Sequence, residues 1–176
     1  GISGYKWTAY LSFRQTNYNE YAMRIDLKDY NSINQIIKTV TGHDLFGQIK
    51  GVTTDSREAI DGDLYIALEG SVNDGHSYLN EVDALNVAAV LINKNKNVSN
   101  LKAQKIEVTD TKKSLGDISK EWRKKFDIPV IGITGSNGKT STKDLLYHVL
   151  KKKYNVHLTR GNYNTSIGLP LTMLEI

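Results

Sequence analysis

Apolar residues follow the chain in two patterns, one with helical spacing and one of short uninterrupted runs. Spacings of three and four residues predict helices, and runs of four or five apolar positions predict strands. The predicted helices cover 33–40, 78–86, 112–126 and 143–150, and the predicted strands cover 52–54, 64–68, 88–92, 105–108, 128–131 and 155–158. Ser32 and Thr111 are the expected N-caps of two helices, and Gly42 is the expected end of the first.

The alternation of strand and helix predicts an α/β fold in two parts. A small N-terminal α/β unit covers 23–126, and a Rossmann-like nucleotide-binding unit begins at 127 and continues to 176. After the last predicted strand, only a loop and the start of a helix at Ile167 or Gly168 remain. A doubly wound domain needs more strands than that, so we expect the chain to stop inside the second unit.

Residues 1–22 lack a sustained period and are rich in Tyr, Asn, Ser and Thr. Because a regular pattern of apolar and polar positions begins at Met23, residues 1–22 are predicted to be an appendage. A second interpretation is an ordinary N-terminal strand or two, for which Tyr5, Trp7 and Phe13 supply apolar surface.

Composition narrows the class of protein. The chain has no cysteine, which excludes disulfides and thiolate chemistry and agrees with a reducing, cytoplasmic location. No apolar run approaches the roughly 20 residues that span a bilayer, so no membrane partner is expected. The net charge of +4 comes largely from Lys94 to Lys153, but no recognition motif with interleaved aromatics accompanies it, and nucleic-acid binding is not expected.

The most informative segment joins an apolar strand to a helix through a glycine-rich turn, Gly132-Ile133-Thr134-Gly135-Ser136-Asn137-Gly138-Lys139-Thr140. Glycines let backbone N–H groups converge on an anion, and the following helix turns its N-terminal donors to the same point. The segment lacks the first glycine of the general phosphate-loop pattern, since Ile133 stands there. Strand, loop and helix nevertheless occur in the order that triphosphate binding requires.

Several motifs together resemble those of the muramyl peptide (Mur) ligases. The loop is similar to their ATP loop, Gly-x-Thr-Gly-x-x-Gly-Lys-Thr, at every fixed position. Upstream motifs are also similar in order and spacing, as is a downstream segment, and the resemblance covers about residues 24–176. These motifs are Asp55-Ser56-Arg57, Gly62-Asp63-Leu64-Tyr65, Asp74-Gly75-His76 and Gly161-Asn162-Tyr163-Asn164 followed by Ile167-Gly168-Leu169-Pro170.

The resemblance implies an ATP- and Mg²⁺-dependent ligase that joins D-alanyl-D-alanine to a UDP-N-acetylmuramoyl tripeptide during peptidoglycan synthesis. Lys139 is the implied catalytic residue, reaching the β and γ phosphates, and Thr140 the implied Mg²⁺ ligand. ATP would also contact Gly135, Ser136, Asn137, Gly138, Ser141, Asn162 and Asn164, and the UDP-linked substrate would contact Ser56, Arg57, Asp74 and His76. The expected oligomeric state is a monomer.

The residues themselves leave some roles open. Asp55 and Arg57 could simply pair and cap a turn, and a turn that positions His76 for a backbone hydrogen bond is favoured over catalysis. Asn162 and Asn164 could be turn formers in an Asn-rich loop. Lys143 lies one turn beyond Lys139 and is predicted to be exposed to solvent.

The implied reaction proceeds through an acyl phosphate and needs no side-chain nucleophile, in agreement with a chain that has none in an obvious arrangement. In these ligases a later glutamate, a modified lysine and a closing domain complete the site, so residues 1–176 alone are expected to bind nucleotide weakly and not to turn over. Two alternatives remain: the sister ligase that adds the third residue of the peptide, and a phosphate-loop module without amide chemistry.

Overall fold

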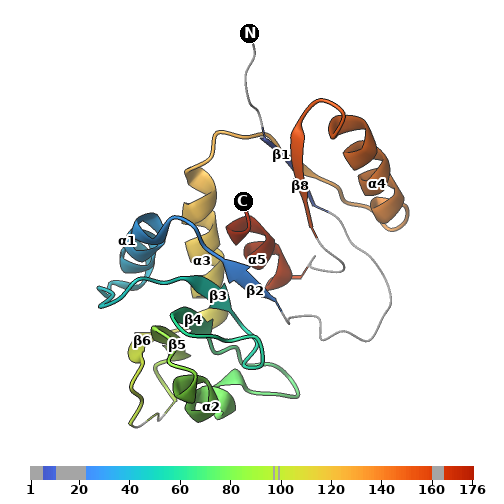
Figure 1. The fold of residues 1–176 in the computed structure, drawn as a ribbon. Helices are drawn as coiled ribbons and strands as arrows, with labels where there is room; N and C mark the ends of the chain where they lie inside the picture. The colour runs from blue at the N-terminus through green and yellow to red at the C-terminus, as the bar shows by residue number, and fades with distance from the viewer. Residues whose placement is uncertain (1–5, 11–22, 97, 99, 160–164) are drawn as a thin grey trace.

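The computed structural model describes residues 6–10, 23–96, 98, 100–159 and 165–176. The strands among these residues form two β-sheets (Figure 1). The strands are β1 (Lys6–Tyr10), β2 (Arg24–Asp26), β3 (Gly51–Thr53), β4 (Asp63–Ile66), β5 (Ala89–Asn93), β6 (Gln104–Val108), β7 (Val130–Gly132) and β8 (Asn155–Leu158). The helices are α1 (Tyr30–Thr41), the 3₁₀ turn η1 (Gly75–Tyr78), α2 (Leu79–Ala84), α3 (Thr111–Lys124), α4 (Lys139–Leu150) and α5 (Gly168–Leu174).

The larger sheet has the strand order β2-β3-β4-β5-β6. Its last four strands run parallel, and β2 pairs antiparallel with β3 at one edge. Parallel strands place all their carboxyl ends at one edge of a sheet, where ligands bind in α/β folds. The predicted α/β class is confirmed.

One face of this sheet carries the main hydrophobic core. Helices α1, α3 and α5 cover that face, and the short α2 covers the other (Figure 1). The spacing predicted for the first helix is confirmed by Ile33 and Ile37, which are fully buried, and the spacing of the longer helix by Leu115 and Ile118. The sheet's central strands are apolar on both faces because both are covered.

The predicted N-caps are wrong, by three residues in α1 and by one in α3. The Asp29 carboxylate accepts from Ser32 N–H, so Asp29 is the N-cap of α1 and Ser32 lies in its first turn. Asp110 likewise caps α3 by accepting from Lys113 N–H, which makes Thr111 the first helical residue. In both cases the side chain of an aspartate upstream of the predicted hydroxyl residue accepts from an N–H of the first helical turn, as an N-cap does. Gly42 ends α1 in the left-handed conformation, as predicted.

The smaller sheet has the order β7-β1-β8, with both outer strands parallel to β1. It places Lys6–Tyr10 in a strand, while the rest of the predicted appendage lies outside the described residues. Residues 128–131 were predicted to form a buried strand. A strand is present as β7, but the prediction of burial is wrong, since Val130 is 38% exposed because β7 lies at the edge of the sheet.

Helix α5 joins the two parts of the chain. It follows β8 in sequence, yet Leu171 and Leu174 are 0% and 1% exposed within the main core, against α3. The connection between α3 and β7 is also fixed, since Arg123 donates to the carbonyl oxygens of Phe126 and Ile128. The predicted division after residue 126 stays a prediction. Among the described helices, none is both long and apolar enough to span a membrane.

Candidate nucleotide and substrate site

The predicted phosphate loop runs from the end of β7 to the first residue of α4. Gly135 and Gly138 have positive φ angles of 148° and 76°, and Gly138 is the N-cap of the helix. A side chain at Gly138 would meet no atom within 4 Å, so the space over the loop is open. The loop is exposed from Thr134 to Gly138, and the free N–H groups of the first helical turn face outward from its end. This arrangement suits an anion at the helix N-terminus.

Lys139 and Thr140 begin the helix beside this open space. The Lys139 ammonium donates to the Gly135 carbonyl oxygen, which folds the side chain back over the loop. The Thr142 hydroxyl instead donates to the Gly138 carbonyl oxygen at 2.9 Å and is a helix-internal contact. Ser141 is exposed on the first turn. The structure therefore brings together all the loop residues predicted to bind ATP.

The prediction that Lys143 is exposed to solvent is wrong. Its side chain is 3% exposed, and its ammonium lies 3.8 Å from the Asp144 carboxylate. Sequence spacing from Lys139 was therefore a poor guide to the exposure of Lys143.

The Asp55-Ser56-Arg57 motif follows β3 at the carboxyl edge of the larger sheet. Arg57 forms a bidentate ion pair with Asp55, whose carboxylate also accepts from Arg57 N–H at 2.9 Å. The pairing that sequence left open is thus present. The hydrogen bonds of Arg57 lower the pKa of Asp55. The Arg57 side chain is nevertheless 63% exposed, and its Nη1 group takes no part in the bidentate pair, so it retains donors for a ligand.

Asp74 and His76 lie in the turn after β4, at the same edge. His76 Nε2 accepts from the Asn93 N–H at 3.0 Å, so the proton on Nδ1 faces the Asp74 carboxylate at 2.6 Å. This assigns the tautomer from its partners. The His76 side chain is buried and accepts a hydrogen bond from the backbone of β5, as the structural interpretation predicts.

Lys96 completes this cluster and was not among the predicted residues. Its ammonium lies 2.7 Å from Asp74 and 3.3 Å from Glu69. Burial alone would raise the pKa of Asp74, but the hydrogen bonds from Lys96 and His76 outweigh it and lower that pKa to about 2. Lys96 stands in a Lys- and Asn-rich loop, where no motif distinguishes it from its neighbours.

Tyr65 lies between the two acidic motifs. Its hydroxyl donates to the Gly75 carbonyl oxygen at 3.0 Å. Burial raises the pKa of Tyr65, and the charges of Asp55 and Asp74 raise it further. The structure therefore gathers the predicted substrate residues Ser56, Arg57, Asp74 and His76 along one sheet edge.

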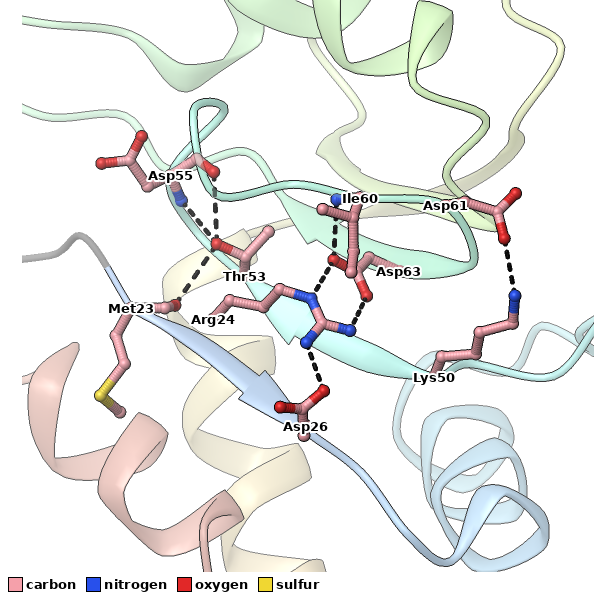
Figure 2. A network of polar contacts seen from close by, with 9 residues as sticks. All are labelled: Met23, Arg24, Asp26, Lys50, Thr53, Asp55, Ile60, Asp61 and Asp63. Carbon is pink, nitrogen blue, oxygen red and sulfur yellow. Dashed lines mark hydrogen bonds and ion pairs between the residues drawn. The ribbon is translucent and has the colours of Figure 1, made fainter.

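Asp63, from the Gly-Asp-Leu-Tyr motif, has a structural role instead (Figure 2). Its carboxylate is fully buried and forms two hydrogen bonds with Arg24, of 2.7 and 2.8 Å, and accepts a third from Ile60 N–H at 3.0 Å. A side chain on Gly51 would lie 2.5 Å from the Arg24 guanidinium. The glycine is therefore needed where the ion pair crosses β3.

Asn162 and Asn164 lie outside the described residues, so their predicted contact with ATP is untested. Within the described part of the chain, no group of three or more His, Cys, Asp or Glu side chains could hold a metal ion. Thr140 at the phosphate loop therefore stays the predicted position for a cation that arrives with a nucleotide.

Comparison with known protein families gives two matches that follow each other along the chain. The profile described as "Mur ligase family, catalytic domain" matches residues 48–123, and the profile described as "Mur ligase middle domain" matches residues 133–176. The first match contains Arg57 and Asp74 at the carboxyl edge of the larger sheet, and the second contains the predicted phosphate loop from Ile133 onward.

Two of the curated relatives that the chain matches have the same name. The chain is 42% identical over 131 residues to the UDP-N-acetylmuramoyl-tripeptide--D-alanyl-D-alanine ligase of Synechocystis, with 73% of this chain and 28% of the relative aligned. It is 39% identical over 147 residues to the ligase of that name from Bacillus subtilis, with 82% and 32% aligned. The chain thus spans about a third of the length of these relatives.

Solved structures agree with the sequence matches. A crystal structure of MurF from Acinetobacter baumannii superposes with a TM-score of 0.75 at 30% identity, over 81% of this chain and 32% of that one. MurF from Thermotoga maritima in complex with ADP superposes with a TM-score of 0.63 at 34% identity, over 70% and 28%.

Proposed function

Because the chain belongs to the Mur ligase family, we propose that it forms the substrate-binding and nucleotide-binding parts of an ATP-dependent ligase that joins D-alanyl-D-alanine to UDP-N-acetylmuramoyl tripeptide. The observation that carries the proposal is the open phosphate loop, with its left-handed Gly138 cap and Lys139 beside it. The names of the relatives support this member of the family over the sister ligase.

The loop would hold the triphosphate of ATP through backbone groups. The N–H groups between Gly135 and Ser141 would surround the β and γ phosphates, and Lys139 would exchange the Gly135 carbonyl for a phosphate oxygen. The Thr140 hydroxyl, half-buried at the second helical position, fits as a ligand of Mg²⁺. That ion would neutralise charge on the phosphates.

The chemistry would need positioning more than reactive side chains. The tripeptide carboxylate attacks the γ phosphorus, ADP leaves, and an acyl phosphate results. The amine of D-alanyl-D-alanine then attacks the acyl carbon, phosphate leaves and the amine loses a proton. Lys139 and the helix N-terminus would stabilise the charge that develops on the transferred phosphoryl group. We place this reaction in the cytoplasm.

The UDP-linked substrate would bind along the carboxyl edge of the larger sheet. Arg57 would direct its remaining N–H donors to a phosphate, with the Ser56 hydroxyl beside it. Asp74 and His76 would act mainly by fixing the shape of this edge, since both are engaged within the protein.

Lys139→Ala tests the nucleotide role. We expect the variant to bind ATP at least about tenfold more weakly in calorimetry, because a charge-assisted contact to phosphate is lost. Lys151→Ala, at the other end of α4, is the matched control and should bind as the wild type does. Equal affinity in Lys139→Ala and the wild type would contradict the assignment.

The identity of the amine substrate is tested in the full-length protein by measuring phosphate release. We expect release that depends on both the UDP-linked tripeptide and D-alanyl-D-alanine. Release that instead requires the UDP-linked dipeptide and a single amino acid would assign the sister reaction.

A further inference from the structure

Helix α5 is anchored in one unit of the chain and contacts the other. Its apolar side, Leu171 and Leu174, is buried in the core beneath the larger sheet. In Figure 1 it lies alongside α3, between that helix and β8. The helix that follows β8 is therefore fixed to the unit that would hold the UDP-linked substrate.

The carboxyl end of α5 makes a polar contact with the smaller sheet. The Glu175 carboxylate lies 3.3 Å from Nε2 of His157 on β8. Both facing atoms are buried from solvent, although their side chains are 12% and 28% exposed overall. The 3.3 Å approach is an ion-pair distance and not a hydrogen bond. Attraction between a carboxylate and the protonated form of an imidazole is stronger where water is excluded than at the surface.

Strand β8 is also connected to the phosphate loop through its sheet and through α4. It lies in the same sheet as β7, which leads into the loop, and α4 packs against it. A displacement of β8 would therefore move the helix whose N-terminus would hold the phosphates. His157 on this strand joins the nucleotide unit to α5 and, through α5, to the substrate unit.

We propose that Glu175 and His157 are positioning residues that set the distance between bound nucleotide and bound UDP-linked substrate. Neither touches a reactant. They act by holding β8, and with it the phosphate loop, against a helix that is fixed in the substrate unit. The inference rests on the proposed function, because it assigns the two ligands to the two units.

The expected signature is a loss of turnover without a loss of binding. Small misplacements of reacting groups cost up to about a hundredfold in rate, whereas each ligand still meets an intact pocket. In the full-length protein, Glu175→Gln keeps the shape of the side chain and removes its charge. We expect kcat to fall about tenfold, with the KM values for ATP and the UDP-linked substrate within about twofold of wild type.

Glu121→Gln is the matched control, since Glu121 pairs with Lys124 on the surface of α3. Its kcat should equal that of the wild type. Glu175→Asp retains the charge and should recover part of the lost rate. An unchanged kcat in Glu175→Gln, or a loss of rate explained entirely by higher KM, would overturn the proposal.

A second measurement separates this proposal from the proposed function. Hydrogen exchange should show faster amide exchange in β8 for Glu175→Gln than for Glu121→Gln, with α3 unchanged. If the wild type releases no phosphate under any substrate combination, the proposed function fails, and the exchange result alone decides whether the contact holds the two units. Unchanged exchange in β8 would then refute the contact's holding role.

Discussion

At the scale of single residues, two aspartates separated by one residue are expected to contribute very differently to stability. Asp63 is fully buried and paired with Arg24, whereas Asp61 pairs with Lys50 at the surface (Figure 2). Removing one partner of a buried pair leaves an uncompensated charge, while an exposed pair is screened by water.

Asp63→Asn is therefore expected to lower the free energy of unfolding by about 3 kcal/mol, because the Arg24 guanidinium loses its charged partner. Urea unfolding followed by circular dichroism measures the change. Asp61→Asn, the control with the same chemistry, should unfold close to the wild type. Similar curves for the two variants would show that the ion pair does not stabilise the fold.

The Asp74 cluster predicts a dependence of stability on pH. The pKa of Asp74 is about 2 in the folded chain, below the value of about 4 for an unfolded aspartate. The folded state thus binds fewer protons, so this contribution is present above about pH 4 and is lost as the pH falls toward 2.

Asp74→Asn removes the contribution at every pH. We expect the difference in unfolding free energy between wild type and Asp74→Asn to be largest near pH 7 and to narrow below about pH 4. Urea unfolding at several pH values measures it. A difference that stays constant down to pH 2.5 would assign the stability to packing and not to charge.

At the scale of elements, the two helix starts show how sequence and structure compare. Periodicity located α1 and α3, because each buries one face in a core. It placed their caps on Ser32 and Thr111, whereas Asp29 and Asp110 hold those positions. Both residue types cap well, and only backbone geometry distinguishes them.

Other features could not be predicted because their partners are distant in the chain. The burial of Lys143 depends on which side of α4 meets its unit. The importance of Lys96 depends on Asp74, 22 residues away, and the role of Asp63 depends on Arg24, 39 residues away. The glycine turn that leads into α4 was predictable because it is formed by consecutive residues.

Two glycines in helical surroundings should respond oppositely to alanine. Gly138 has φ of 76°, so Gly138→Ala strains the backbone, and we expect a loss of about 1 kcal/mol in stability together with weaker ATP binding. Gly116 lies within α3 with open space around it, so Gly116→Ala should stabilise by about 0.5–1 kcal/mol.

Thermal unfolding and calorimetric titration with ATP measure the two effects. Gly116→Ala should leave ATP affinity unchanged, since it lies in the first unit. An increase in stability for Gly138→Ala would contradict the left-handed cap.

At the scale of the whole molecule, helix α5 follows the smaller sheet in sequence but completes the core of the larger sheet. Leu171 has no exposed surface, while Leu145 on α4 is 69% exposed. Replacing each of these leucines with alanine therefore compares a buried position in the core with an exposed position on α4.

Leu171→Ala is expected to lower the free energy of unfolding by about 3 kcal/mol, because it leaves a cavity between α5 and α3. Hydrogen exchange should show reduced protection in α3 as well as in α5. Leu145→Ala should change neither. A loss of protection confined to α5 would show that the packing of this helix does not stabilise α3.

The position of α5 has a consequence for how the chain folds during synthesis. The larger sheet and its helices are complete in sequence by Lys124, but Leu171 and Leu174 of their core are translated almost 50 residues later. Domains usually fold as they leave the ribosome, amino-terminal part first. Here the first unit finishes packing only after the phosphate loop and α4 have also emerged.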